Sequence, residues 1–190
     1  MSTVLFLPGH MEGISSREYS KTIAAIKSKG YDVKFVPIKW RRTTIDDWVN
    51  ELWKEYDKYN PGDVILAGFS FGAMTAFAAA SKKNPKELWL FSLSPYFGED
   101  MSSLKKSWRK SIGKRKAAAF ERISSGAMAK SIECRTLLFI GEKEAKTYPT
   151  LRVRANAVRG ALKNSRLVVV PETEHDVSDD RYISAIVANI

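Results

Sequence analysis

Residues Val64–Phe77 have the sequence VILAGFSFGAMTAF, in which a short apolar run meets a run of small residues. The apolar part is typical of a buried strand, and the alanine-rich part after Ser70 is typical of a central, buried helix. Between them lies the pattern G-x-S-x-G, which arises by chance in roughly one chain in fifteen of this length at average residue usage. Placed between a strand and a helix, the pattern predicts a sharp turn that exposes the Ser70 hydroxyl and requires small residues at Gly68 and Gly72.

The rest of the chain alternates between strand-like and helix-like segments. Six short runs are continuously apolar and rich in branched or aromatic residues, as in strands buried on both faces of a sheet. They lie at Thr3–Leu7, Asp32–Pro37, Asp63–Ala67, Glu87–Leu93, Arg135–Ile140 and Arg166–Val170. Helical stripes lie between most of them, and this alternation predicts right-handed crossovers and a parallel sheet. The expected fold is α/β: a doubly wound, three-layer α/β/α arrangement with a six-stranded, mostly parallel sheet.

Capping residues mark the starts of two of these helices. Ser15 followed by Glu18 predicts a capping box, and Gly30 is placed to end the helix that follows. Thr44 and Asp47 predict the start of the next helix.

One connection is longer than a single crossover helix requires. About 40 residues separate Ser94 from Arg135, and residues 97–130 are expected to form one or two helices. These helices would cap the C-terminal edge of the sheet, where open α/β sheets bind their ligands. Within this cap, seven of the twelve residues from Lys105 to Lys116 are Lys or Arg. Nothing else divides the chain, so a single domain over residues 1–190 is expected, with the cap as an insertion.

The composition restricts the class of protein. The chain has 190 residues, 44% of them hydrophobic, a formal net charge of +10 and one cysteine, Cys134, which is expected to be structural. No apolar run approaches the roughly 20 residues that span a bilayer, so we expect a cytoplasmic protein with no membrane span. No helix-turn-helix, RNA-binding signature or zinc spacing accompanies the positive charge. The simpler interpretation is that the positive charge makes the surface soluble. Nucleic acid is a less favoured partner, and the basic cap does not exclude it.

Three residue types needed for nucleophilic catalysis follow three different strands. A serine hydroxyl needs a general base, and the base needs a group that orients it. His175 follows the last predicted strand by five residues, which returns it to the sheet edge that carries Ser70. Glu142 and Glu144 follow the fifth strand at the same edge, and either carboxylate could orient the histidine.

With serine, acid and histidine in this order, the chain resembles the α/β-hydrolase superfamily. The resemblance implies that Ser70 is the nucleophile, His175 the base, and Glu144 the acid, three residues after the strand-ending Gly141. Other carboxylates stay open as alternatives for the acid: Glu142 and, because some members place the acid after the fourth strand, Asp100 or Glu99.

The loop Pro8-Gly9-His10-Met11 resembles the family's loop that supplies an oxyanion N–H after the first strand. The resemblance implies that the main-chain N–H groups of Phe71 and His10 bind the oxyanion, with Met11 as an alternative to His10. The imidazole of His10 need not participate. Apolar residues near the turn are expected to line an acyl pocket, namely Tyr96, Phe97 and Met11, together with Phe71; Phe69 is expected in the core.

The resemblance implies a carboxylesterase-like serine hydrolase that cleaves small to medium-sized esters or thioesters through an acyl-enzyme intermediate. No phosphate loop, dinucleotide motif or metal-ligand spacing is present, so no cofactor or metal is expected. Alternative functions are an acyltransferase, an amide or carbon–carbon hydrolase, and a non-catalytic protein that docks an anionic partner on the basic cap.

The resemblance also predicts the sheet order, with the strands running second, first, third, fourth, fifth and sixth. Relatives usually begin with two further strands that this sequence lacks, so a minimal, core-only member is expected. The missing strands would leave an open sheet edge, which fits either a monomer or a homodimer.

Overall fold

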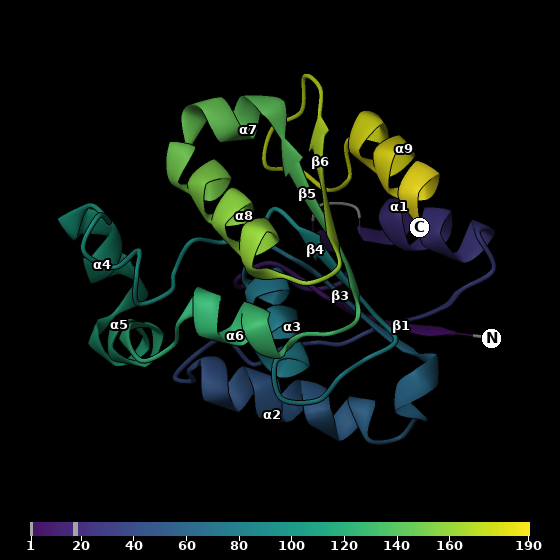
Figure 1. Ribbon diagram of the computed structural model, residues 1–190, viewed down its shortest axis with the longest axis horizontal. Coiled ribbons are helices and arrows are strands. Elements are labelled where there is room, and N and C mark those ends of the chain that lie inside the picture. Colours follow the sequence, from purple (N-terminus) through teal and green to yellow (C-terminus); the bar gives the residue numbers. More distant parts are fainter. Residues whose placement is uncertain (1, 17–18) are drawn as a thin grey trace.

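The computed structural model describes residues 2–16 and 19–190, which form a six-stranded sheet with the order β2-β1-β3-β4-β5-β6 (Figure 1). All five strand pairs are parallel. The strands are β1 Thr3–Leu7, β2 Asp32–Phe35, β3 Val64–Phe69, β4 Glu87–Phe91, β5 Arg135–Gly141 and β6 Ser165–Val170. The predicted α/β fold and strand order are therefore confirmed.

Helices cover both faces of the sheet (Figure 1). One face carries α1 (Tyr19–Ser28) and α9 (Asp180–Asn189), and the other carries α2 (Ile45–Tyr56), α3 (Phe71–Ala80) and α8 (Pro149–Ala161). Shorter helices lie at α4 Lys106–Ile112, α5 Lys114–Glu121, α6 Ser125–Ser131 and α7 Glu142–Thr147, with a 3₁₀ turn at Pro61–Asp63. Within the described ranges, no helix combines the length and the hydropathy needed to cross a membrane.

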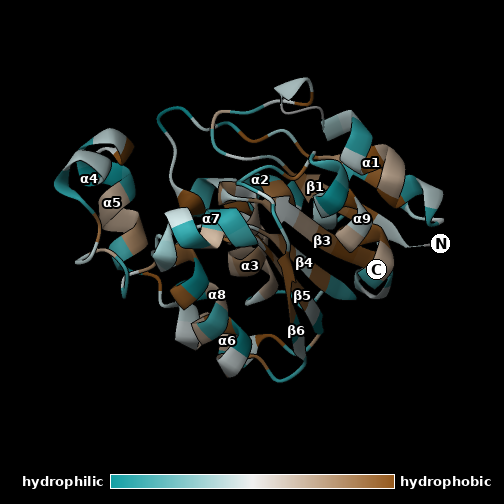
Figure 2. Ribbon diagram, turned by 90° about the horizontal axis from the view of Figure 1, so that it is seen from above, coloured by the Kyte–Doolittle hydropathy of each residue, from teal (hydrophilic) through white to brown (hydrophobic). Residues whose placement is uncertain are grey.

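The central strands are buried on both faces because their side chains alternate between two hydrophobic clusters. In β1, Val4 and Phe6 pack toward α1 and α9, whereas Leu5 and Leu7 pack toward α2 and α3. The edge strands β2 and β6 are only partly buried, so the prediction that all six strands are buried on both faces is wrong for these two. Each of them has a neighbouring strand on one side only. Figure 2 shows the same division, with hydrophobic residues on the strands and hydrophilic ones on outer helices such as α4.

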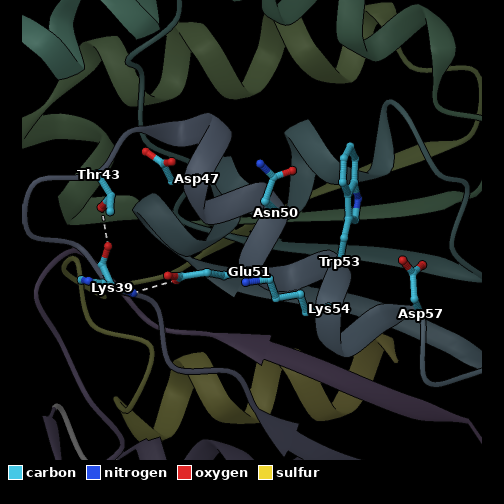
Figure 3. Close-up of a pocket in the computed structure, with 8 residues that line it drawn as sticks. All are labelled: Lys39, Thr43, Asp47, Asn50, Glu51, Trp53, Lys54 and Asp57. Atoms are coloured by element: carbon cyan, nitrogen blue, oxygen red, sulfur yellow. Dashed lines mark hydrogen bonds between the residues drawn. The ribbon is translucent and has the colours of Figure 1, made fainter.

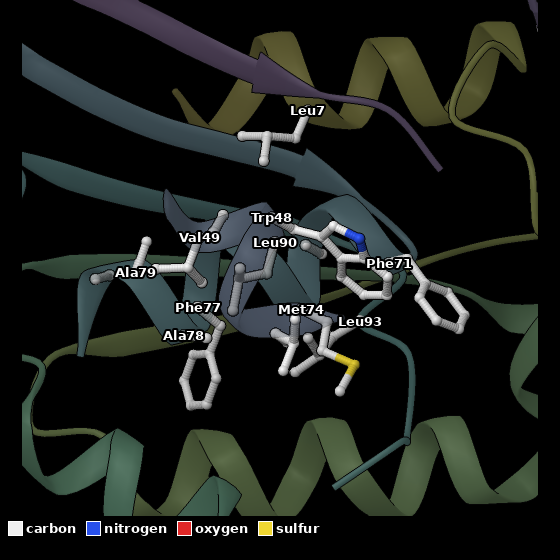
Figure 4. Packing of buried hydrophobic residues seen from close by; sticks show 14 of the residues in the cluster. Leu7, Trp48, Val49, Phe71, Met74, Phe77, Ala78, Ala79, Leu90 and Leu93 are labelled. Atoms are coloured by element: carbon white, nitrogen blue, oxygen red, sulfur yellow. The ribbon is translucent and has the colours of Figure 1, made fainter. Parts of the chain in front are cut away.

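Helix α3 is the most buried helix beside the sheet, with all ten residues buried. Figure 4 shows its side chains Phe71, Met74 and Phe77 packed with Trp48 of α2 and Leu90 of β4. The small alanines between these larger residues let the helix approach the sheet closely, as the sequence predicted.

Helix ends follow the predicted capping signals where they are described. The main-chain N–H of Thr44 donates to Asp47 Oδ2 at 2.8 Å at the start of α2, and Gly30 has a φ of 88° just after α1. Glu18, which was expected to form a capping box with Ser15, lies outside the described residues.

The cap contains three helices, α4, α5 and α6, where the sequence predicted one or two. Gly113 separates α4 from α5 with a φ of 81°, a left-handed conformation that favours glycine. The Ser124 hydroxyl accepts a hydrogen bond from the Ala127 N–H at 3.2 Å and so begins α6. Helices α4 and α5 lie at the left of Figure 1, beyond the C-terminal ends of the strands.

Candidate active site

Ser70 lies in a strained turn between β3 and α3, with φ 57° and ψ −115°. The two glycines of the motif make this turn possible. A Cβ on Gly68 would lie 2.3 Å from main-chain atoms of Gly72, and a Cβ on Gly72 would lie 2.4 Å from the carbonyl oxygen of Pro8. The close approach at Gly72 brings the start of α3 directly against the loop that follows β1.

The loop after β1 is held in place by α1. The main-chain N–H of Gly9 donates to the Tyr19 hydroxyl at 2.8 Å, and this hydroxyl donates to the Glu12 carboxylate. The main-chain N–H groups of His10 and Phe71 donate to no other residue in the described part of the chain. Two such N–H groups beside a strained serine are suited to bind an oxyanion.

Glu144 and His175 are brought together at the neighbouring strand ends. Glu144 lies in the first turn of α7 and is fully buried. Its Oε1 is hydrogen bonded to His175 Nδ1, and its Oε2 accepts from the Ser92 hydroxyl at 2.7 Å and from the Gly141 N–H at 3.0 Å. A carboxylate that holds Nδ1 of an imidazole leaves Nε2 to accept a proton.

Ser92 contacts the Glu144 carboxylate on its second oxygen, and Tyr182 contacts Ser92. The sequence predicted a role for neither residue. Ser92 follows β4 with a φ of 51°, and its hydroxyl lies 3.0 Å from the Tyr182 hydroxyl of α9. Burial, and then the nearby Glu144 carboxylate, raise the pKa of Tyr182 well above its usual value, so the phenol stays protonated. The available signal was the pair of serines, Ser92 and Ser94, at the C-terminal end of a predicted strand.

The loop that carries His175 is fixed against α7 and β3. The carbonyl of Thr173 accepts from the N–H groups of Lys143 and Glu144 at 3.0 and 3.3 Å. The ring of Phe69, the residue before Ser70, lies 4.6 Å from the His175 ring. Phe69 is buried, as expected, and it also packs against the histidine.

Ser70 itself is paired with a second serine. Its Oγ lies 3.1 Å from Ser94 Oγ, and no hydrogen bond joins Ser70 to His175 among the contacts of the described residues. Catalytic hydrogen bonds often become short only when substrate is bound, so this geometry is compatible with a resting serine. Ser94 was not predicted, and its only sequence signal is its place after β4.

Asp100, an alternative acid, forms an ion pair with Arg154 and, in the described part of the chain, no hydrogen bond or ion pair with His175. Arg154 Nε lies 2.9 Å from Asp100 Oδ2 and Arg154 Nη2 lies 2.5 Å from Asp100 Oδ1, and both side chains are buried. The Arg154 guanidinium also donates to the Ser125 hydroxyl. This ion pair ties the loop after β4 to α6 and α8, and it corrects the expectation that Asp100 could orient the histidine.

The two other alternative acids also have structural partners. Glu142 is paired at the surface with Lys146 at 2.9 Å, and its carboxylate accepts from the Glu172 N–H at 3.1 Å. Glu99 accepts from the Ser124 hydroxyl at 2.7 Å at the start of α6. Of the four carboxylates considered for the acid, Glu144 is the one that the structure places on His175.

The expected pocket residues divide into two groups. Tyr96 packs its ring 5.0 Å from the Phe71 ring and 6.3 Å from the half-exposed Trp108, and Met11 is half exposed. Phe97 has no exposed surface and packs against the ring of Phe77 at 5.8 Å. The expectation that Phe97 lines the pocket is therefore corrected, because its ring belongs to the core beneath.

A hollow lies along the exposed side of α2 (Figure 3), where it is lined by Lys39, Thr43, Asp47, Asn50, Glu51, Trp53, Lys54 and Asp57. None of the predicted site residues lines it, so we do not assign the chemistry there. Among the described residues, no group of three or more His, Cys, Asp or Glu side chains is arranged to hold a metal ion.

No protein-family model and no curated protein matches this sequence. Solved structures do match the fold. Est1E from Butyrivibrio proteoclasticus has a TM-score of 0.80 and 16% identity, over 98% of this chain and 84% of that one. An α/β hydrolase from the metagenome of lagoon sediments at Mar Chica has a TM-score of 0.74 and 17% identity, over 98% and 88%. MenH from S. aureus has a TM-score of 0.66 and 17% identity, over 98% and 92%. The chain has the α/β-hydrolase fold.

Proposed function

We propose that this chain is a serine hydrolase that cleaves carboxylic esters or thioesters of small to medium size. The observation that carries the proposal is the bond between the buried Glu144 and His175, on two loops beside the strained turn of Ser70. The structural likeness to Est1E and to an esterase domain from a Rhodothermus marinus protein supports an ester as the bond that is cleaved.

In the first step, Ser70 Oγ attacks the carbonyl carbon of the substrate and His175 Nε2 takes the hydroxyl proton. Glu144 holds the other ring nitrogen and stabilises the imidazolium that forms. The carbonyl oxygen becomes negatively charged and accepts hydrogen bonds from the main-chain N–H groups of Phe71 and His10. Removal of one such donor costs about 10²–10³-fold in kcat in a known serine enzyme.

In the second step, the bond from the carbonyl carbon to the leaving oxygen or sulfur breaks. The leaving alcohol or thiol takes the proton from His175, and the acyl group stays on Ser70 as an ester. Water then attacks this ester with His175 as the base. The carboxylic acid leaves, and the Ser70 hydroxyl is restored.

The size of substrate is argued from the aromatic residues around the turn. Tyr96 and Phe120 each lie within 6 Å of the Phe71 ring, so the wall beside Ser70 is apolar and rigid. Trp108 of α4 extends this aromatic group to the surface, where its side chain is half exposed. An acyl chain that packs along these rings is expected to be short or medium in length.

A fluorophosphonate probe tests the nucleophile directly, because it modifies only activated serines. We expect the probe to label the wild-type protein and to leave Ser70→Ala unlabelled. Ser28→Ala, which removes an exposed hydroxyl at the end of α1, is the matched control and should label like the wild type. A series of p-nitrophenyl esters of increasing acyl length then measures turnover. A folded wild-type protein that neither labels nor hydrolyses any ester would overturn the proposal.

A further inference from the structure

Lys116 of α5 extends from the basic cap to the loop that follows β1. Its Nζ lies 3.4 Å from His10 Nε2 and 5.9 Å from the centre of the Trp48 ring. The His10 ring lies 4.8 Å from the ring of Phe71, which directly follows Ser70. A cation therefore lies beside the loop that would hold the oxyanion.

In the described part of the chain, the ammonium group of Lys116 has no acidic partner. Among the described residues, no carboxylate oxygen lies within the 4.0 Å that defines an ion pair with it. Two arginines of the cap are engaged differently, since Arg109 pairs with Glu121 at 2.7 Å and Arg115 donates to the Arg42 carbonyl at 3.2 Å. Burial lowers the pKa of Lys116, which means that part of its hydration has been lost without compensation by an anion.

The same cluster contains a buried donor that has no hydrogen-bond partner among the described residues. Trp40 is 4% exposed, and its indole N–H makes no hydrogen bond with any described residue. Its ring lies 5.6 Å from the His10 ring and 6.4 Å from the Phe71 ring. Buried indole N–H groups are normally paired, and both Trp40 and Lys116 contact His10, so an unpaired indole N–H and a cation without an acidic partner in one cluster point to a bound acceptor.

His10 completes the cluster as a neutral group. Burial, and then the nearby Lys116 cation, lower the pKa of His10, so its imidazole is uncharged near pH 7. Glu12, the acid in the same loop, has its carboxylate bonded to the Tyr19 hydroxyl. Lys116 therefore supplies a positive charge at this end of the site, and the neutral His10 does not.

We propose that the substrate carries a carboxylate, which the Lys116 ammonium and the Trp40 indole N–H bind beside the loop that follows β1. The inference rests on the proposed function, because the reacting carbonyl of the same molecule must lie at Ser70. A carboxylate offers several acceptor positions and forms charge-assisted hydrogen bonds with an ammonium group. Half-esters of dicarboxylic acids, and esters whose leaving group carries a carboxylate, are the two kinds of substrate with this chemistry.

Paired esters of matched shape test this inference. Monoethyl succinate carries the anion in its acyl part, and in ethyl 4-methylpentanoate an isopropyl group replaces that carboxylate. A second pair, 4-acetoxybenzoate and 4-isopropylphenyl acetate, places the same difference in the leaving group. The quantity compared is kcat/KM for the anionic ester divided by kcat/KM for its neutral partner, from titration of the acid released.

For at least one pair, we expect Lys116→Gln to lower this ratio by roughly tenfold to a hundredfold, mainly through KM, because a hydrogen bond to a charged group contributes about 1.5–3 kcal/mol. Lys116→Arg should restore most of the ratio. Trp40→Phe should lower the ratio, because it removes the indole N–H while an aromatic ring stays at this position. Lys114→Gln removes the same charge from an exposed position on the same helix and should leave the ratio unchanged.

The outcomes separate this inference from the proposed function. Hydrolysis of the neutral esters, with a ratio that Lys116→Gln does not change in either pair, overturns the carboxylate site and leaves the hydrolase intact. If no ester is hydrolysed, the carboxylate site is tested by a binding measurement. Monoethyl succinate and 4-acetoxybenzoate are titrated into Ser70→Ala while tryptophan fluorescence is recorded. The site is supported if either ester binds saturably to Ser70→Ala and binds at least tenfold more weakly to the Ser70→Ala, Lys116→Gln double variant. Equal binding to both proteins, or no binding to either, refutes it.

Discussion

Glu144→Gln replaces one carboxylate oxygen by an NH₂ group, and the surrounding donors decide which one. The position of Oε2 must be an acceptor, because the Gly141 main-chain N–H points at it from 3.0 Å and cannot reverse its role. The glutamine therefore places its carbonyl oxygen there and its NH₂ group against His175. Nδ1 of the imidazole then has to accept, and the ring proton moves to Nε2, where it blocks transfer from Ser70.

The size of the effect follows from this change of tautomer. In a serine protease of another fold, the same change lowers kcat about 10⁴-fold, which corresponds to about 5.4 kcal/mol of activation free energy. We expect kcat of Glu144→Gln for a p-nitrophenyl ester to fall by roughly three to four orders of magnitude. KM should change little, because Glu144 is fully buried and cannot touch the substrate. Initial rates of p-nitrophenol release measure both quantities, and a thermal melt checks that the variant is folded.

Glu142→Gln is the control, since it makes the same chemical change two residues earlier at a surface carboxylate that pairs with Lys146. We expect this variant to keep kcat near the wild-type value. If Glu144→Gln kept more than about a tenth of the wild-type kcat, which is a loss of under about 1.4 kcal/mol, the argument from tautomers would be refuted. Equal losses in the two variants would also remove Glu144 from its role.

Three further predictions concern the groups around this site. Arg154→Met leaves the buried Asp100 carboxylate without its cation, so urea titration should show a loss of about 3–5 kcal/mol in unfolding free energy. The kcat of the folded variant should stay within a fewfold of the wild-type value. A large fall in kcat would mean that Asp100 takes part in the reaction. Ser92→Ala removes the 2.7 Å hydrogen bond to Glu144 and should lower kcat about tenfold to a hundredfold with KM unchanged. If only the stability of the protein changed, Ser92 would have no part in positioning Glu144 for the reaction. Burial opposes ionisation of Glu99, but hydrogen bonds at the start of α6 lower its pKa below the usual value of a glutamate. A carboxyl group whose folded pKa is lowered stabilises the fold above its unfolded pKa and loses this contribution as the pH falls through the folded pKa. As the pH falls below the usual glutamate pKa, urea midpoints should therefore fall more steeply in the wild type than in Glu99→Gln. Parallel curves would contradict the assignment.

The central strands were predictable because burial on both faces leaves a local signal. Val64–Phe69 is continuously apolar, since a helix covers each face of the sheet at β3. The burial of the edge strand Ser165–Val170 was not predictable in the same way. Its sequence is nearly as apolar, and its partial exposure depends on its place in the sheet, which is set by the other strands.

The positions of the candidate site residues were also predictable, for a topological reason. Parallel strands end at one edge of a sheet, so side chains that follow β3, β5 and β6 must lie near one another. The partners of those side chains were not predictable. Asp100 meets Arg154 from 54 residues away, and Ser92 meets Tyr182 from 90 residues away, so no local pattern connects either pair.

The choice between Glu142 and Glu144 depends on a helix that the sequence did not predict. Glu142–Thr147 forms the short helix α7 directly after β5. Residues two positions apart in a helix point about 200° apart around its axis, so only one of the two carboxylates can face the core. The Thr173 carbonyl accepts from the N–H groups of the first turn and so fixes which face turns inward. Glu144 lies on that inner face with His175, and the helix turns Glu142 to the surface.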